Sequence, residues 1–112
     1  MLIEIPVETQ ERQELHLITR DVQQTIADSG VQSGICILFS PHTTAGLTIN
    51  SYLDPATAKD LQFEIDRLVP TRIDFIHIVD TPSDAAGHIK SSLVGNQLTL
   101  IIQDGKAILG GS

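Results

Sequence analysis

The sequence predicts an α+β fold, a single domain over residues 1–112 in which a mixed or antiparallel β-sheet packs with about three helices. Short apolar, β-branched runs separate segments whose apolar residues recur every three or four positions. Some predicted strands are joined by short polar turns and others by helices, which argues against a doubly wound parallel sheet. A length of 112 residues, of which 41% are hydrophobic and 19% charged, fits one ordinary globular domain.

The first third of the chain predicts a hairpin, a helix and a core strand. Residues 2–7 and 15–18 are expected to be strands joined by a polar turn. Thr19 can cap a helix that ends at Gly30, because glycine accepts the left-handed conformation of a helix end. Residues 34–39 are apolar throughout, which predicts a buried central strand covered on both faces.

The middle of the chain predicts another strand and the clearest helix. Residues 47–50 alternate between apolar and polar side chains. Asp54 and Pro55 then begin a helix, because aspartate accepts the free N–H groups of the first turn and proline has no N–H to leave unpaired. This helix stops at Pro70. Its apolar stripe is Ala58, Leu61, Ile65 and Leu68.

A strand and a short helix are expected next. The strand covers residues 73–79, and either Ser83 or Asp84 caps the helix, which ends before Gly95.

A terminal hairpin closes the prediction. Residues 97–102 pair with residues 106–109 across Asp104 and Gly105, a dipeptide that accepts the positive φ angles of a tight turn. The chain has no GxGxxG motif and no Walker lysine loop, so dinucleotide and P-loop chemistry have no support.

The charge balance excludes two classes of partner. The chain has 14 acidic and 7 basic residues and a net charge of -7, and the basic residues form no cluster. We therefore expect binding neither to nucleic acid nor to an anionic membrane. A cytoplasmic location is expected, because signal-peptide and membrane-spanning patterns are absent and the single Cys36 has no intrachain disulfide partner. A chain this short has a thin core, so we expect it to assemble into an oligomer.

Three of the four histidines stand where a metal site would need them. His42 follows the apolar run 34–39, where a side chain can emerge into a loop. His77 interrupts an apolar strand, where an imidazole needs a polar partner. His88 lies one helical turn after Asp84, so the two share a face. Each has a plainer alternative: a turn residue, a hydrogen-bonded core histidine, and an exposed helical pair respectively.

Taken together, the three histidines predict a metal site at the loop side of the sheet. Imidazole suits zinc, and three protein ligands with one open position form the pattern of a catalytic zinc site. The predicted ligands are His42, His77 and His88, with zinc as the ion and magnesium as the alternative. His16 is left out as a surface residue, and no HxH, HExxH or CxxC spacing supports the site locally.

Polar neighbours complete the candidate site. Thr43 and Thr44 are the candidates for binding a cofactor or anion through hydroxyl and backbone N–H groups, although a β-turn role fits them equally well. Asn50 ends a predicted strand and can orient a ligand through its amide. The catalytic candidates are His42, Asn50 and His88.

Three segments carry a family resemblance: residues 41–50 (PHTTAGLTIN), the pair Asp54-Pro55, and residues 84–95 (DAAGHIKSSLVG). Together they resemble the secondary thiamine-phosphate synthase family. That resemblance implies an α+β fold, a homotrimer, and a metal site formed by the three histidines. The implied activity joins a hydroxymethylpyrimidine pyrophosphate to a thiazole phosphate, so the partner would be a small phosphorylated molecule. Such a transfer needs a divalent cation and donors to the leaving pyrophosphate.

The chain departs from that family's pattern at two places. Ser51 stands where the family often has glutamate, which removes one candidate carboxylate. The family commonly continues past the final glycine, so we expect the chain ending at Ser112 to be truncated relative to it or to fill that sheet position otherwise.

Three functions stay open. The first is a metal-dependent transferase of the thiamine-phosphate type. The alternative is a non-catalytic trimeric protein that binds a metal or a small ligand, which the lack of an arginine clamp and of a general-base motif favours. The third is a structural or interaction domain.

Overall fold

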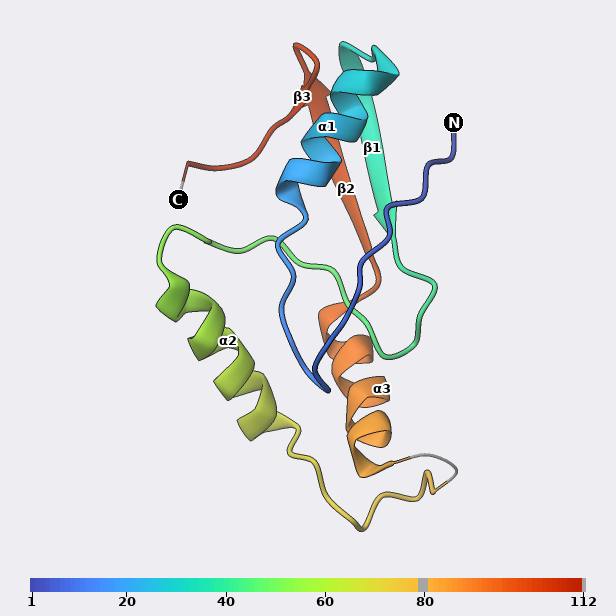
Figure 1. The fold of residues 1–112 in the computed structure, drawn as a ribbon, viewed down its shortest axis with the longest axis vertical. Coiled ribbons are helices and arrows are strands. Elements are labelled where there is room, and N and C mark those ends of the chain that lie inside the picture. The colour runs from blue at the N-terminus through green and yellow to red at the C-terminus, as the bar shows by residue number, and fades with distance from the viewer. Residues whose placement is uncertain (79–80, 112) are drawn as a thin grey trace. The chain divides into compact units, whose positions relative to one another are not determined.

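The structure, a computed structural model, describes residues 1–78 and 81–111 and confirms the predicted α+β class (Figure 1). Within these residues it contains three helices and a three-stranded antiparallel sheet in the order β1-β2-β3. The helices are α1 (Thr19–Ser29), α2 (Pro55–Leu68) and α3 (Pro82–Val94). The strands are β1 (Ser33–Phe39), β2 (Gln97–Gln103) and β3 (Lys106–Ala107).

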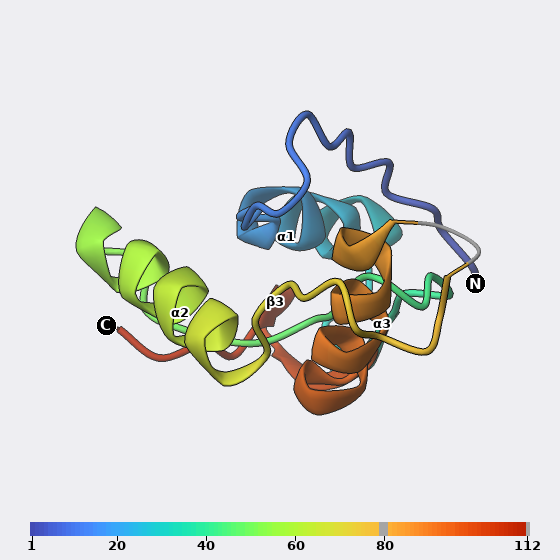
Figure 2. The same cartoon turned by 90° about the horizontal axis from the view of Figure 1, so that it is seen from below.

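The chain divides into two compact units. Residues 1–37 and 99–112 form one, called here the sheet unit. Residues 38–98 form the other, called the two-helix unit, which contains α2 and α3 as two separate helices (Figure 2). Among the described residues, none of the helices has the length and apolar character that crossing a bilayer requires.

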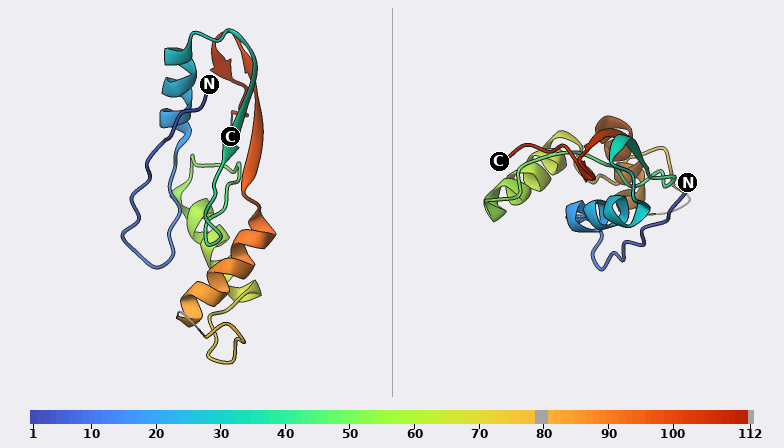
Figure 3. Two further views of the ribbon diagram at one scale, coloured as in Figure 1. Left: turned by 90° about the vertical axis from the view of Figure 1, so that its right-hand side faces the viewer. Right: turned by 90° about the horizontal axis from the view of Figure 1, so that it is seen from above.

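The core of the sheet unit lies between α1 and one face of the sheet (Figure 3). Leu100 and Ile102 alternate along β2 and are buried, which places them on the covered face. Val22 and Ile26 lie one turn apart and are the buried residues of α1. The buried Ala107 of β3 completes this core.

One side chain joins α1 to β3. The Gln23 amide donates to the carbonyl of Ala107 at 3.1 Å and accepts from its N–H at 2.9 Å. Because both polar groups of this edge residue are satisfied by one amide, the helix is fixed in register with the strand.

The predicted terminal hairpin is confirmed. Ile102 pairs with Ala107 and Gln103 with Lys106. The turn between them has positive φ at both central residues, 53° at Asp104 and 76° at Gly105, as the sequence predicted. The second strand ends at Ala107, two residues earlier than expected.

Two predicted helix caps are confirmed and two are corrected. Asp54 caps α2 by accepting the N–H of Ala56 at 2.9 Å, and Gly30 ends α1 at a φ of 75°. Thr19 is the first residue of α1 and makes no side-chain cap. In α3 the cap is Thr81, whose hydroxyl accepts the N–H of Asp84 at 3.2 Å, rather than Ser83 or Asp84 itself.

Four predicted strands are absent from the described sheet: residues 2–7, 15–18, 47–50 and 73–78, the last of them predicted to reach Val79, which lies outside the described residues. Alternation of apolar and polar side chains marks an extended, half-exposed chain, but it supplies no hydrogen-bonded neighbour. Leu47, the first residue of segment 47–50, is an example. Its N–H donates to the carbonyl of Gly95 at the end of α3 and not to a neighbouring strand.

Burial also differs from expectation at β1 and α2. β1 is an edge strand of the described sheet and not the buried central strand that was expected. Its residues Ile35, Ile37 and Phe39 are 62%, 56% and 61% exposed. They are exposed because they lie on the sheet face that α1 does not cover. No residue of α2 is fully buried, and Leu68 of its apolar stripe is exposed. The buried apolar residues of the two-helix unit are Val69, Ala85 and Ala86.

Candidate functional site

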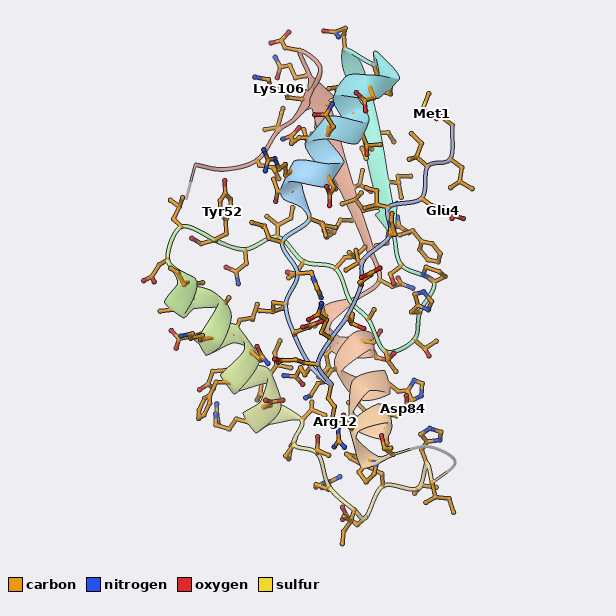
Figure 4. All side chains as sticks on the ribbon, in the orientation of Figure 1. Met1, Glu4, Arg12, Tyr52, Asp84 and Lys106 are labelled. Atoms are coloured by element: carbon orange, nitrogen blue, oxygen red, sulfur yellow. The ribbon has the colours of Figure 1, made fainter. Side chains whose placement is uncertain are left out.

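The first turns of α3 carry the residues on which the site is built. Asp84 and His88 are four residues apart, which places both side chains on one face of the helix. Asp84 projects from α3 in Figure 4. Because Pro82 occupies the first helical position and Thr81 caps it, the start of the helix and hence the position of Asp84 are fixed.

Two histidines converge on one carboxylate oxygen. His77 Nε2 lies 3.0 Å and His88 Nε2 lies 3.1 Å from Oδ2 of Asp84. The rings of the two histidines are 5.1 Å apart and meet edge to face at 72°. The side chains of His77, Asp84 and His88 are 36%, 29% and 40% exposed, so the cluster is open to solvent on one side.

The tautomer of His88 is set by the loop before α2. Its Nδ1 lies 3.2 Å from the carbonyl oxygen of Thr43. A carbonyl can only accept, so Nδ1 carries the proton and donates. In the neutral ring, Nε2 then presents a lone pair to Asp84. Two lone pairs at 3.1 Å repel each other unless a proton or a metal ion lies between them.

The carboxylate of Asp84 is held in its ionised form. The hydrogen bond from His77 lowers the pKa of Asp84, and the charge and hydrogen bond of His88 act in the same direction, while desolvation opposes them. Asp84 therefore carries its negative charge at neutral pH and is available as a ligand.

The cluster fits a transition metal ion. One ligand atom from each of His77, Asp84 and His88 lies within 4.8 Å of the other two. Zinc binds imidazole nitrogen and carboxylate oxygen at about 2.0–2.2 Å, so the ligand atoms of a tetrahedral site are roughly 3.3 Å apart. The observed 3.0 and 3.1 Å are slightly shorter, so small side-chain rotations would admit the ion.

The loop that precedes α2 runs along α3 and is hydrogen-bonded to it. Thr43 meets His88, the carbonyl of Ala45 accepts the hydroxyl of Ser91, and the N–H of Leu47 is bound to the carbonyl at the end of the helix. Thr43 and Thr44 form a turn, closed by a hydrogen bond from the N–H of Ala45 to the carbonyl of His42 at 3.4 Å. The loop is thus hydrogen-bonded to α3 at three positions.

Two glycines permit this close approach. A Cβ on Gly46 would lie 2.8 Å from Cγ1 of Val94, and a Cβ on Gly87 would lie 3.4 Å from the Thr44 side chain. The small residues of the PHTTAG and DAAGH segments therefore let the loop and the helix pack together and set the distance from Thr43 to His88.

The structure places the other predicted site residues outside the cluster. His42 is exposed and is not among the three residues whose ligand atoms converge. Thr43 contributes its carbonyl, and Thr44 packs against Gly87. The side chain of Asn50 accepts the N–H of Ser51, its own neighbour, at 2.8 Å.

A polar hollow adjoins the cluster and shares His88 with it. Its volume is about 430 Å³. The polar side chains that line it are His42, Thr43, His88, Ser91, Ser92 and Asn96. His42 is therefore a neighbour of the cluster through this hollow.

A second, smaller hollow of about 190 Å³ shares His77 and contains a residue that sequence reasoning missed. Arg72 lines it, stacks over the ring of Phe75 at 5.0 Å, and lies 3.4 Å from Asp74. No sequence signal distinguished Arg72 from a surface residue. The role of Asp84 was better marked, because its four-residue spacing from His88 was visible in the sequence.

The comparisons with known proteins agree on one family. A family model described as "UPF0047 protein YjbQ-like" matches residues 3–112. UPF0047 protein MJ1081 of Methanocaldococcus jannaschii is 44% identical over 110 residues, which are 98% of this chain and 78% of the relative. UPF0047 protein YugU of Bacillus subtilis is 36% identical over 110 residues, 98% of this chain and 82% of the relative.

Solved structures give the same answer. The crystal structure of an uncharacterised YjbQ/UPF0047-family protein from Clostridium acetobutylicum superposes with a TM-score of 0.89 at 36% identity. The superposition covers 97% of this chain and 82% of the Clostridium acetobutylicum chain. A YjbQ-like protein of unknown function from Sulfolobus solfataricus superposes with a TM-score of 0.86 at 26% identity, covering 94% of this chain and 75% of that one.

These findings correct the resemblance drawn from the sequence. The assignment to a thiamine-phosphate synthase family was wrong, and the transferase activity that it implied is withdrawn with it, because the matching model and relatives carry the UPF0047 name and no activity. The motifs behind that resemblance have a sufficient structural role, since they form the loop and helix described above. The family model spans nearly the whole chain, and this protein therefore belongs to the UPF0047 (YjbQ-like) family.

Proposed function

We propose that this protein is a non-catalytic metal-binding protein that holds one zinc ion between His77, Asp84 and His88. The observation that carries the proposal is the approach of two imidazole Nε2 atoms to the same oxygen of Asp84, at 3.0 and 3.1 Å. With the other nitrogen of His88 donating to a carbonyl, a proton or a metal ion must lie between its Nε2 and Asp84, and a metal ion in that place would also bind His77.

Zinc is the preferred ion because two of the three ligands are nitrogen. Imidazole suits zinc and related transition metals, whereas magnesium prefers oxygen ligands and retains several waters. The carbonyl of Thr43 supports this choice, since a metal-bound histidine usually donates its second N–H to a carbonyl or carboxylate. Magnesium remains the alternative ion to be compared.

We propose binding rather than catalysis because, among the described residues, no carboxylate is placed to act as a general base beside the cluster. Asp84 is engaged by both histidines, and no aspartate or glutamate is among the residues that line the adjoining hollow. A metal-bound water would therefore lack a carboxylate general base on that side. The uncharacterised relatives give no reason to assign an activity.

Self-association is a second part of the proposal. Ile35, Ile37, Phe39 and Ile101 are all more than half exposed and belong to the sheet face that α1 does not cover. Covering such a face with another copy would enlarge a small core. Sedimentation equilibrium measures the number of copies, and more than one copy is expected, with the trimer of the sequence-based expectation as one outcome. A monomer at every concentration would refute this part alone.

The test of the metal site is a titration of the metal-free protein with zinc and with magnesium. Isothermal titration calorimetry should give one zinc per chain and much weaker binding of magnesium. His77→Ala and His88→Ala should each lose at least about 100-fold in zinc affinity, because each removes a direct ligand, and even outer partners are worth about 10–100-fold.

Two further histidine variants serve as controls. His16 is paired with Glu14 at 2.7 Å and belongs to the sheet unit, so His16→Ala should bind zinc like the parent protein. His42→Ala should also retain one zinc per chain, because its ring is outside the cluster. Equal zinc affinity in the parent, His77→Ala and His88→Ala would refute the proposed site.

A further inference from the structure

The hollow beside His88 has hydrogen-bonding capacity that the metal site does not use. Within the described residues, the side chains of His42, Thr43 and Asn96 make no hydrogen bond. All three line this hollow together with His88. In small-ligand sites, a few placed polar groups fix the ligand's orientation, and these side chains can serve in that way.

The charge of the hollow is unusual for this chain. The chain has 14 acidic residues and a net charge of -7, yet none of the residues that line the hollow is acidic. None is lysine or arginine either. Arg72 lies in the other hollow, beside His77, with its charge balanced by Asp74. The charge that a ligand in this hollow meets is therefore set by the cluster of His77, Asp84 and His88.

A divalent ion held by Asp84 leaves about one positive charge, because both histidines bind it as neutral rings. Three protein ligands also leave one coordination position open. Because His88 belongs both to the cluster and to the lining of the hollow, an ion held by the cluster would lie beside the hollow. A ligand in the hollow can therefore bind the metal and the free donors at the same time.

We propose that the hollow binds the carboxylate group of a small molecule, with one carboxylate oxygen on the metal and the donors of the hollow around the rest. A singly charged carboxylate matches the single positive charge. A phosphate dianion would leave a negative charge without a lysine or arginine to balance it. The volume of about 430 Å³ lies toward the lower end of the range for ligand pockets, which implies a small molecule.

This inference rests on the proposed function, since the carboxylate is bound partly by the metal. The test uses the full chain loaded with Co²⁺, an ion that occupies zinc sites and whose visible absorption responds to its ligands. Acetate and lactate are the probes. Acetamide, which has the shape of acetate without its charge, is the neutral control, and inorganic phosphate is the competing anion.

Acetate and lactate should change the Co²⁺ spectrum with saturation, acetamide should not, and phosphate should bind at least tenfold more weakly than lactate. Asn96→Ala should weaken lactate binding about tenfold, because it removes a donor to a charged group, and should leave Co²⁺ affinity unchanged. Asn50→Ala is the matched control, because that exposed amide bonds only its neighbour Ser51 among the described residues. It should change neither.

The outcomes separate this inference from the proposed function. Failure to bind Co²⁺ stoichiometrically overturns both. Normal Co²⁺ binding with no response to acetate or lactate, or with an equal response to acetamide, overturns the carboxylate site and leaves the metal site standing. Tighter binding of phosphate than of lactate, or unchanged lactate binding in Asn96→Ala, also overturns it.

Discussion

Replacing Asp84 by asparagine tests the metal cluster with the smallest change in shape. The carboxylate and the amide have nearly the same size, and asparagine keeps one oxygen as an acceptor. The substitution removes only the negative charge and one oxygen. Because Oδ2 of Asp84 is the atom on which His77 and His88 converge, the loss of that charge affects the centre of the cluster directly.

The size of the effect follows from this position. Partners that only orient metal ligands are worth about 10–100-fold in metal affinity. Asp84 lies 3.0 and 3.1 Å from the two ring nitrogens and is therefore placed as a ligand rather than as an orienting partner. Asp84→Asn should raise the zinc dissociation constant by about 100-fold or more, the upper end of that range. The amide oxygen can still bind weakly, so some affinity should remain.

Competition with a chromophoric chelator measures this change. Asp60→Asn is the matched control, because it makes the same replacement at an exposed position on α2 of the same unit. Circular dichroism of both metal-free variants checks that they keep the helix content of the parent protein. If Asp84→Asn binds zinc as tightly as Asp60→Asn while both are folded, the carboxylate is not a ligand and the reasoning from its two contacts is wrong.

Acidification from pH 7.5 to 5 should release zinc, because protons compete for the two imidazoles, whereas the lowered pKa of Asp84 keeps that carboxylate ionised over this range. In the metal-free protein, the stabilising effect of Asp84 should be complete above the ordinary aspartate value of about 3.9 and be lost only as the pH falls through its lowered pKa. Zinc retained at pH 5 would contradict imidazole ligation. Gly46→Ala places a Cβ 2.8 Å from Val94, so it should destabilise the protein by about 1–3 kcal/mol in urea unfolding. It should also weaken zinc binding, because it displaces the loop. Unchanged stability and unchanged zinc affinity would show that the loop does not position the cluster. Ile26→Ala, at a residue only 3% exposed, should lower the free energy of unfolding by about 2–5 kcal/mol in the same assay. Ile76→Ala, at a residue 97% exposed, should lower it by less than about 0.5 kcal/mol. Equal effects of the two substitutions would contradict the described core.

Elements defined by local chemistry were predictable from the sequence. The cap at Asp54, the helix end at Gly30 and the turn at Asp104 and Gly105 each depend on residues a few positions apart. Strand pairing depends on distant partners. The segments 2–7 and 47–50 have the alternation of strands, but nothing in their own residues specifies a neighbouring strand.

The candidate site divides in the same way. The pairing of Asp84 with His88 follows from helical spacing and was visible in the sequence. The approach of His77 to Asp84 depends on the path of the chain between α2 and α3, which no local pattern encodes. His42 was grouped with the cluster because it ends a strand, yet the loop that follows the strand presents the Thr43 carbonyl, and not the His42 ring, to His88.

One physical requirement connects the loop before α2 with the metal site. The polar groups of the backbone must find partners. The loop from Thr43 to Leu47 satisfies three of these groups on α3, at His88, Ser91 and Gly95. The same contacts orient the His88 ring and fix its tautomer before any metal binds. Placing a ligand in advance reduces the ordering that binding requires.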